Sequence, residues 1–480
     1  MSYTSLQYFA LVIITAIVYY LLPRRIRWTA LMLGSSVFWI AASGADRMIP
    51  VVFLRSIALS WAFGLLLCRV KKGRRLLLLA AIALSAAPLL ISKMGTLLFE
   101  ALLRSRSPQW IIPLGLSFYS MQMIAYLADV YKGKIAPQRN FFKYYLFISF
   151  FPQLLQGPIP RYDEMESQLF EGHRFSSANL MNGIQLIIWG FFLKYMIADK
   201  AAVFVNRVFG EYKYFDGTHI LAAAVLYSFQ LYTDFLSCVT LSQGVAGIFG
   251  IALRDNFCHP YFATSIKDFW RRWHMSLSSW LRDYIYIPLG GNRKGTLRKY
   301  VNLLITFGVS GLWHGASLSF IAWGLLHGAY QIIGDLTHRF RERVYCAAGI
   351  EKDGLVYLTL KRIGTFVLVC IGWILFRANS FSAALQMIRG IVMDFSLTTL
   401  FTGGLCSVGL DGADWMMLIL SLVVLCAVSF LQERKSIRVW FNKQMFLVRW
   451  AIYLAAICVI WIFGTYGFGF NAQDFIYGGF

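Results

Sequence analysis

Two histidines, forty positions apart, are the side chains of this sequence best suited to move a proton. His274 closes the run Asp268-Phe-Trp-Arg-Arg-Trp-His274, and His314 follows Trp313 at the end of an apolar run. Imidazole is the side chain whose charge changes nearest to neutral pH, and a titratable group in such apolar surroundings is a functional-site hypothesis by default. We therefore predict that His314 is a general base, which removes the proton of an acceptor hydroxyl as it attacks a thioester carbonyl.

Each histidine also has a structural interpretation. His314 could be a neutral histidine that is hydrogen-bonded between two helices, and His274 could pack a helix at the membrane interface. Burial among apolar groups favours the neutral imidazole that a base requires, and the adjacent Arg271 and Arg272 favour the same form of His274. We expect His274 to line the cytoplasmic mouth of a passage or to position the acyl donor.

The residues around His274 combine positive charge with indole rings. Together with Trp313, the predicted substrate-binding residues of this region are Asp268, Trp270, Arg271, Arg272 and Trp273. The glycine-rich turn 288–295 adds Arg293 and Lys294 to this set. Such cations could bind the phosphates of a nucleotide-bearing thioester, although an ordinary basic cytoplasmic loop explains the same charges.

Outside the two histidines and the basic segment, the sequence offers few residues that could bind substrate, nucleotide or metal. Asp234 lies in an apolar run, and we predict that it lines a cavity and binds substrate. The turn that ends at Gly295 is not a P-loop, because Thr296 stands where that motif requires lysine. His259 and His327 are expected to be isolated, so no metal site is predicted.

The composition indicates a polytopic membrane protein. Hydrophobic residues make up 58% of the 480 positions and charged residues 14%, whereas a soluble domain has about 25% charged residues. The net charge of +22 is better explained by basic cytoplasmic loops than by nucleic acid. The eight scattered cysteines form no Cys-x-x-Cys pair, so neither a disulfide framework nor a zinc site is expected.

The apolar runs predict an all-α fold, one polytopic domain over residues 1–480, with about 11–13 spans of about 20 residues each. The predicted spans are 6–22, 28–42, 49–68, 76–92, 110–131, 180–198, 220–250, 300–334 (a hairpin of two), 360–377, 414–431 and 447–468. The run 141–156 is short and predicts a re-entrant piece. The periodicity of 265–286 predicts an amphipathic interfacial helix. The first run is expected to be retained as a span and not removed as a signal.

The basic loops predict the orientation. Arginines and lysines follow the first and third predicted spans and crowd the segment 267–299. Because such loops stay in the cytoplasm, we expect the N-terminus outside and this segment inside, in a cytoplasmic (inner) cell membrane.

These motifs closely resemble the membrane-bound O-acyltransferase (MBOAT) family, and most of all its branch of alginate O-acetyltransferases. The resemblance rests on the stretch from Asp268 to Gly295 and on Gly311-Leu-Trp-His-Gly-Ala316. Weaker matches support it at 112–118, 129–131, 151–158, 372–378 and 475–477. The chain departs from the family pattern at Thr240, where relatives carry a second carboxylate.

The resemblance implies a helical membrane fold with a funnel from outside and a tunnel from the cytoplasm. It implies that His314 is the catalytic histidine and that His274 is the second histidine, on the cytoplasmic side. It further implies an acyl-CoA donor, with acetyl-CoA favoured over an acyl-carrier protein, and no bound cofactor. The acceptor would be an exported polysaccharide, commonly reached through a separate SGNH-hydrolase-like partner, and no nucleic acid is expected.

Two alternatives stay open. One is the transfer of D-alanine or another acyl group from a carrier protein to teichoic acid. The other leaves enzymes altogether and makes the chain an exporter of glycan precursors, for which paired broken spans in two related halves would be expected.

Overall fold

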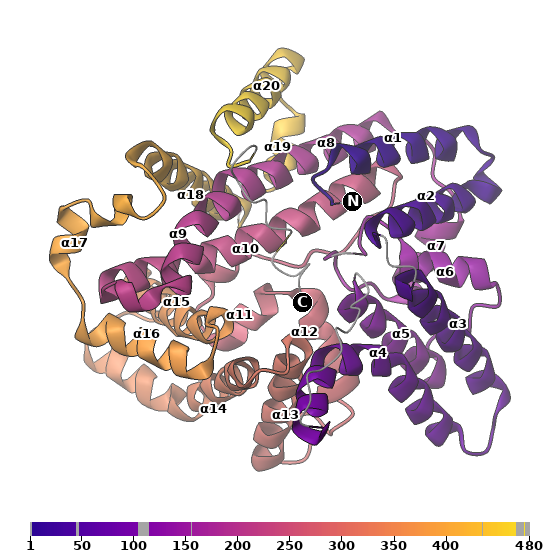
Figure 1. Cartoon of the computed structure of the whole chain (residues 1–480), viewed down its shortest axis with the longest axis horizontal. Coiled ribbons are helices and arrows are strands. Elements are labelled where there is room, and N and C mark those ends of the chain that lie inside the picture. The colour runs from indigo at the N-terminus through magenta and orange to yellow at the C-terminus, as the bar shows by residue number, and fades with distance from the viewer. Residues whose placement is uncertain are drawn as a thin grey trace. The chain divides into compact units, whose positions relative to one another are not determined.

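The computed structural model describes residues 2–44, 48–103, 115–154, 156–433, 435–466 and 475. Within these ranges the chain is built of helices and contains no strand, as Figure 1 shows. The predicted all-α class is confirmed. The chain divides into two compact units, of which the first comprises 1–190, 238–255 and 474–480 and the second 191–237 and 256–473. The prediction of one domain stays a prediction.

The first unit holds the N-terminal helices, which are indigo to magenta in Figure 1. Its helices are α1 (Leu6–Leu21), η1 (Arg24–Ile26), α2 (Arg27–Ala42), α3 (Met48–Arg69), α4 (Arg74–Leu103), α5 (Leu116–Tyr131), α6 (Phe141–Ser149), α7 (Tyr162–Phe170) and nearly all of α8 (Ser177–Phe191). Helix α1 packs on α2, and α3, α4 and α5 pack on one another. Gly183 of α8 faces Gly244, which lies near the end of α10 (Gly217–Ile248). A Cβ at either glycine would lie within 2.8 Å of the carbonyl oxygen of the other. Small residues thus let these two helices approach closely.

The second unit holds the predicted site. Its elements are η2 (Phe192–Ala198, a π-helical turn), α9 (Asp199–Gly210), η3 (Tyr212–Tyr214), most of α10 (Gly217–Ile248), η4 (Pro260–Phe262), α11 (Ile266–Arg272), α12 (Met275–Leu281), η5 (Arg282–Tyr286, also π-helical), α13 (Thr296–His314), α14 (Leu318–Ala347), α15 (Leu355–Arg377), α16 (Phe381–Met393), α17 (Leu397–Phe401), η6 (Gly404–Ser407), α18 (Gly412–Gln432), α19 (Ile437–Asn442) and α20 (Phe446–Phe463).

Helices α13 and α14 form the tight antiparallel hairpin that the run 300–334 predicts. Glycines on both helices make the close approach possible. A Cβ on Gly311 would lie 2.4 Å from the carbonyl oxygen of Phe320, and one on Gly324 would lie 2.3 Å from that of Phe307. The hairpin matters for function because it carries His314 at its turn.

Seven helices in the described ranges are long and apolar enough to cross a membrane, judged by length and composition. They are Met48–Arg69, Arg74–Lys93, Ser177–Gly210, Gly217–Ile248, Leu355–Arg377, Gly412–Gln432 and Phe446–Phe463. Shorter apolar helices accompany them at Leu6–Leu21 and Phe381–Met393. The chain is therefore a multi-pass membrane protein, as predicted.

The predicted apolar runs coincide with observed helices to within a few residues over most of the chain. The prediction of one continuous helix over 265–286 is wrong, because the chain breaks into α11, α12 and a π-helical turn. The amphipathic α16 and the short α17 were not predicted. Residues 112–114, Ile476 and Tyr477, which belong to motifs quoted above, lie outside the described residues.

Candidate active site

His314 is the last residue of α13 and is deeply buried. Its side chain lies in an aromatic pocket and the residue is only 3% exposed. The centroid of its ring lies 4.7 Å from that of Trp313, 5.1 Å from Trp323 and 5.1 Å from Phe376. Helix α13 places the imidazole at the hairpin turn, while α14 and α15 supply the other walls. The prediction that His314 sits in apolar surroundings is confirmed.

His274 occupies the break between α11 and α12. Its backbone has φ 43° and ψ 54°, a left-handed conformation that costs a residue other than glycine about 1–2 kcal/mol. Asn256 holds this break. Its backbone oxygen accepts from the amide of Met275 at 2.9 Å, and its Oδ1 accepts from the amide of Ser276 at 3.0 Å. Strained backbone held by its surroundings is typical of functional sites.

The fold brings the two histidines to the same aromatic cluster, although forty residues separate them in the sequence. Trp313 lies between them, with its ring centroid 6.1 Å from that of His274 and 4.7 Å from that of His314. Phe235 of α10 covers the other side of His274 at 4.7 Å. The predicted pairing of the two histidines in one site is therefore consistent with the geometry.

Burial controls the protonation of His274. The residue is 1% exposed, and desolvation lowers the pKa of its imidazole to about 3. The ring is therefore neutral at physiological pH. The adjacent arginines, which we expected to contribute, are not the cause of this shift; burial is.

The indoles of the Trp-Arg-Arg-Trp run form the packing around this cluster. Trp270 is buried and donates from Nε1 to Nδ1 of His327 at 3.2 Å. Trp273 is also buried and packs on Trp373 of α15, with centroids 5.0 Å apart. Their predicted role in binding substrate stays a prediction, and their observed role is to shape the walls.

The charged members of the same run lie at its edge. Asp268 belongs to the first turn of α11 and bonds Arg272 Nε with both carboxylate oxygens at 3.2 Å. Arg272 also reaches Glu433 at 3.2 Å. Arg271 is exposed. Of the three predicted ligands, Asp268 and Arg272 are thus engaged with each other, while Arg271 is open to solvent.

Arg293 and Lys294 lie in the exposed turn that precedes α13. Three glycines with positive φ, at 290, 291 and 295, bend this turn. Asn302 of α13 anchors it, because its Nδ2 donates to the carbonyl of Gly291 at 2.9 Å. The predicted glycine-rich basic turn is confirmed, and its two cations point into solvent-accessible space.

Asp234 lies outside the histidine cluster in a buried ion-pair network. Lys194 Nζ lies 2.8 Å from Oδ1 of Asp234 and 2.9 Å from Oδ1 of Asp199. All three residues are at most 4% exposed. The sequence reasoning missed Lys194, although a lysine in the apolar run 187–198 was a usable signal. The role of Asp234 as a substrate ligand stays a prediction.

His327 was expected to be isolated with respect to metal ligands, and its place in the aromatic cluster was not predicted. It belongs to the same aromatic cluster, with its ring centroid 5.2 Å from those of both Trp270 and Trp323. Its position, thirteen residues after His314 on the return helix of the hairpin, was the available signal.

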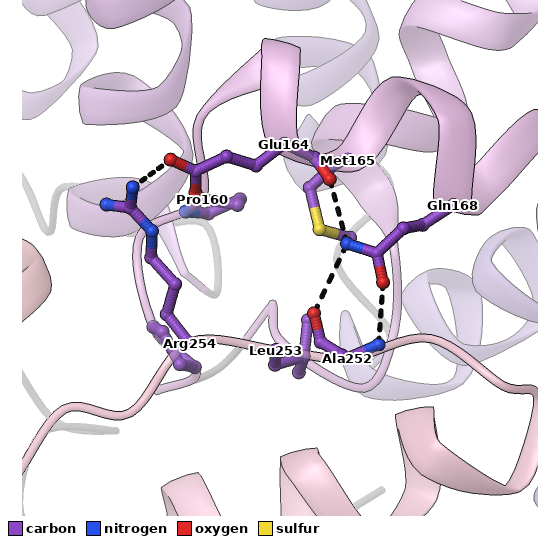
Figure 2. A pocket seen from close by; sticks show the side chains of 8 residues that line it. Pro160, Glu164, Met165, Gln168, Ala252, Leu253 and Arg254 are labelled. Carbon is purple, nitrogen blue, oxygen red and sulfur yellow. Dashed lines mark hydrogen bonds and ion pairs between the residues drawn. The ribbon is translucent and has the colours of Figure 1, made fainter.

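The first unit contains a separate open pocket of about 400 Å³. Figure 2 shows it framed on one side by the ion pair of Glu164 with Arg254 and on the other by Gln168, whose side chain bonds the backbone of Ala252. The lining is completed by Pro158, Pro160, Met165 and Leu253. Its polar groups thus bond one another or the backbone of the lining residues.

Comparison with known proteins shows which family the region of the site is similar to. Residues 136–347, which include both histidines, match the model of the MBOAT, membrane-bound O-acyltransferase family. The chain is 38% identical over 277 residues to the probable alginate O-acetylase AlgI of Pseudomonas putida, covering 58% of this chain and 54% of that protein.

The names of two other relatives refer to other cell-wall polymers. The peptidoglycan O-acetyltransferase of Helicobacter pylori is 37% identical over 308 residues, which is 59% of this chain and 57% of the relative. The teichoic acid D-alanyltransferase of Bacillus subtilis is 26% identical over 337 residues, 66% of this chain and 82% of the relative. The chain spans little more than half the length of the first two relatives. Residues 136–347 are thus similar to the membrane-bound O-acyltransferase family, and the chain is similar to alginate O-acetylases.

Proposed function

We propose that the protein is a membrane-bound O-acyltransferase that moves an acyl group, acetyl in the first instance, from a cytoplasmic thioester to a hydroxyl of a cell-envelope polysaccharide. The observation that carries the proposal is the cluster of two buried histidines joined by Trp313. Its support is the match of residues 136–347 to the family model and the similarity of the chain to O-acetylases of alginate and peptidoglycan.

In this proposal His314 is the general base. The neutral imidazole accepts the proton of the acceptor hydroxyl while the hydroxyl oxygen attacks the thioester carbonyl, so a carbon–oxygen bond forms. The tetrahedral intermediate then expels the thiolate, the carbon–sulfur bond breaks, and the imidazolium returns its proton to the sulfur. Aromatic walls exclude water, which protects the thioester from hydrolysis. His274, neutral and fixed in place, positions the donor.

Replacement of the base tests the proposal directly. His314→Ala should lower O-acetylation of the cell-surface glycan by about 10²–10⁴-fold, the usual contribution of a general base. The measurement is mass spectrometry of the glycan from cells that express the variant, normalised to the amount of inserted protein. His338→Ala is the matched control, since His338 is an exposed histidine of α14. Wild-type acetylation by His314→Ala would falsify the assignment.

The donor is proposed to be acetyl-CoA, with its phosphates near the exposed basic turn. Arg293→Ala together with Lys294→Ala should raise the KM for acetyl-CoA and weaken its dependence on salt, because charge-assisted bonds to phosphate are lost. Lys71→Ala together with Lys72→Ala removes the same charge from another exposed loop. Equal effects of the two double variants would mean that the turn does not bind acetyl-CoA and that its charges only determine the orientation in the membrane.

The same glycan analysis separates the acyl groups. D-alanine on teichoic acid, lost with the gene, would favour transfer from a carrier protein, and glycan export without any acyl change would favour a transporter. In our proposal the hydroxyl that accepts the acyl group belongs either to the polysaccharide itself or to an extracytoplasmic SGNH-hydrolase-like partner, which then passes the acyl group to a polymer outside the membrane.

A further inference from the structure

His327, a third histidine, is fully buried beside the two histidines of the proposed site. It lies on α14 and is 0% exposed. The rings of Trp270 and Trp323 flank it edge-on, with centroids 5.2 Å away. Phe307 and Trp373 lie further out at 6.4 and 6.3 Å. The proposed mechanism leaves this buried imidazole without a task.

The hydrogen bond from Trp270 determines the tautomer of His327. An indole nitrogen only donates, so the bond of 3.2 Å from Trp270 Nε1 requires a lone pair on Nδ1 of His327. The ring proton therefore sits on Nε2. Trp270 belongs to α11, the helix that ends at the break held by His274. One hydrogen bond thus ties the Trp-Arg-Arg-Trp helix to the hairpin that carries His314.

Gly372 of α15 closes the other side of the ring. A Cβ at this position would lie 2.7 Å from Nε2 of His327, which is closer than real Cβ atoms come to a neighbour. The imidazole, which α14 carries, is therefore contacted by α11 at Nδ1 and by α15 at Nε2. The ring has one orientation, and that orientation presents Nδ1 to Trp270.

An apolar side chain at this place would remove one unpaired polar group, Nε2, but would leave the buried Trp270 N–H without an acceptor. Among the described residues Nε2 has no hydrogen-bond acceptor, and a buried polar group without a partner costs free energy. Such a group in a native protein calls for an explanation other than packing. The acceptor on Nδ1, which leucine would lack, is the feature that only a polar residue supplies.

Trp323 connects His327 to the proposed base. Its ring centroid lies 5.2 Å from that of His327 and 5.1 Å from that of His314, to which it is perpendicular. Trp270 also contacts Trp323 at 5.7 Å. We infer that His327 is a positioning residue, which fixes the indoles of Trp270 and Trp323 and thereby the orientation of the His314 imidazole. This inference rests on the proposed function.

The test compares two nearly isosteric replacements in the full-length protein. Asn places an amide oxygen near the position of Nδ1, and Leu has the same shape without an acceptor. In inside-out membrane vesicles supplied with labelled acetyl-CoA, His327→Leu should lower kcat about tenfold or more, because misplacement by about 1 Å can cost 10²-fold in rate. The KM for acetyl-CoA should stay unchanged, and His327→Asn should recover much of the rate.

Two further variants probe the same contacts without touching His327. Trp270→Phe keeps a ring but removes the donor, so its effect should not add to that of His327→Leu. Gly372→Ala should lower kcat by displacing the imidazole, whereas Gly364→Ala on the same helix, with nothing within 4 Å of its added Cβ, should not. If either His327 variant fails to fold, the comparison of Gly372→Ala with Gly364→Ala still tests whether displacement of the His327 ring lowers kcat.

The possible outcomes separate this inference from the function on which it rests. If His314→Ala abolishes transfer but His327→Leu keeps the wild-type kcat, only the positioning role is overturned. A higher KM at unchanged kcat would make His327 part of the donor site and would also overturn it. Activity retained by His314→Ala would remove the base itself, and with it the proposed function.

Discussion

At the level of single residues, the left-handed backbone of His274 shows how the site is held. Few residues other than glycine adopt φ 43°, and the conformation persists because Asn256 bonds the two amides that follow it. A second backbone bond, from the amide of Cys258 to the carbonyl of Arg272, fixes the other side of the break. Thus a segment ten to twenty residues upstream determines where the His274 imidazole lies.

Asn256→Ala should therefore affect activity more than stability. It leaves the buried amide of Ser276 without its side-chain acceptor, which should destabilise the protein by about 1–3 kcal/mol, and it frees His274 to move. Thermal unfolding in detergent and acetyl transfer in vesicles measure the two effects. Asn140→Ala, which removes the cap of α6, is the control for a comparable loss of stability. Equal transfer by both variants would argue against a positioning role for Asn256.

At the level of elements, the π-helical turn between α8 and α9 carries a buried ion-pair network. The turn Phe192–Ala198 places Lys194 against two carboxylates from α9 and α10. π-helical turns inside α-helices are often found at functional sites. Here the wider turn joins three elements through one lysine, because Asp199 begins α9 and Asp234 lies in the middle of α10.

Removal of Lys194 alone should strongly lower the free energy of unfolding. Lys194→Met leaves two buried carboxylates without their cation, and breaking a buried ion pair costs about 3–5 kcal/mol. The triple variant with Asp199→Asn and Asp234→Asn removes the uncompensated charge and should recover most of that loss. Thermal unfolding and the yield of folded protein measure both. A triple variant as unstable as Lys194→Met would mean that shape, and not charge, explains the network.

At the level of the whole molecule, the arrangement of charge along the chain gives a testable topology. One candidate span, α10, separates the exposed Tyr214 from the basic segment that contains Lys294. Because basic loops stay in the cytoplasm, these two positions should lie on opposite sides of the membrane, with Lys294 inside. The ion pairs of Arg272 with Glu433 then place the end of α18 on the inner side as well.

Cysteine labelling in intact cells measures this topology. In a background whose eight native cysteines are replaced by alanine, Tyr214→Cys should react with a membrane-impermeant maleimide added outside. Lys294→Cys should react only after the cells are opened. The reverse pattern would invert the orientation, and would place the basic turn away from any cytoplasmic coenzyme A.

The sequence by itself determined the class of the protein and the limits of its long helices. An apolar helix of about 20 residues is required by the thickness of the bilayer, so runs such as 49–68 and 360–377 read directly as α3 and α15. The hairpin over 300–334 was predictable for the same reason, as was the candidate base His314, because a titratable side chain in such a run is rare.

Only the tertiary structure decided which of these side chains meet. The break at His274, the bond between Trp270 and His327, and the pairing of Asp234 with Lys194 each depend on residues between twenty and fifty-seven positions apart. Helical periodicity says nothing about such contacts, since packing between helices determines which faces meet and at what depth. The amino-acid types therefore indicated the chemistry, and the close packing of glycine-bearing helices determined its geometry.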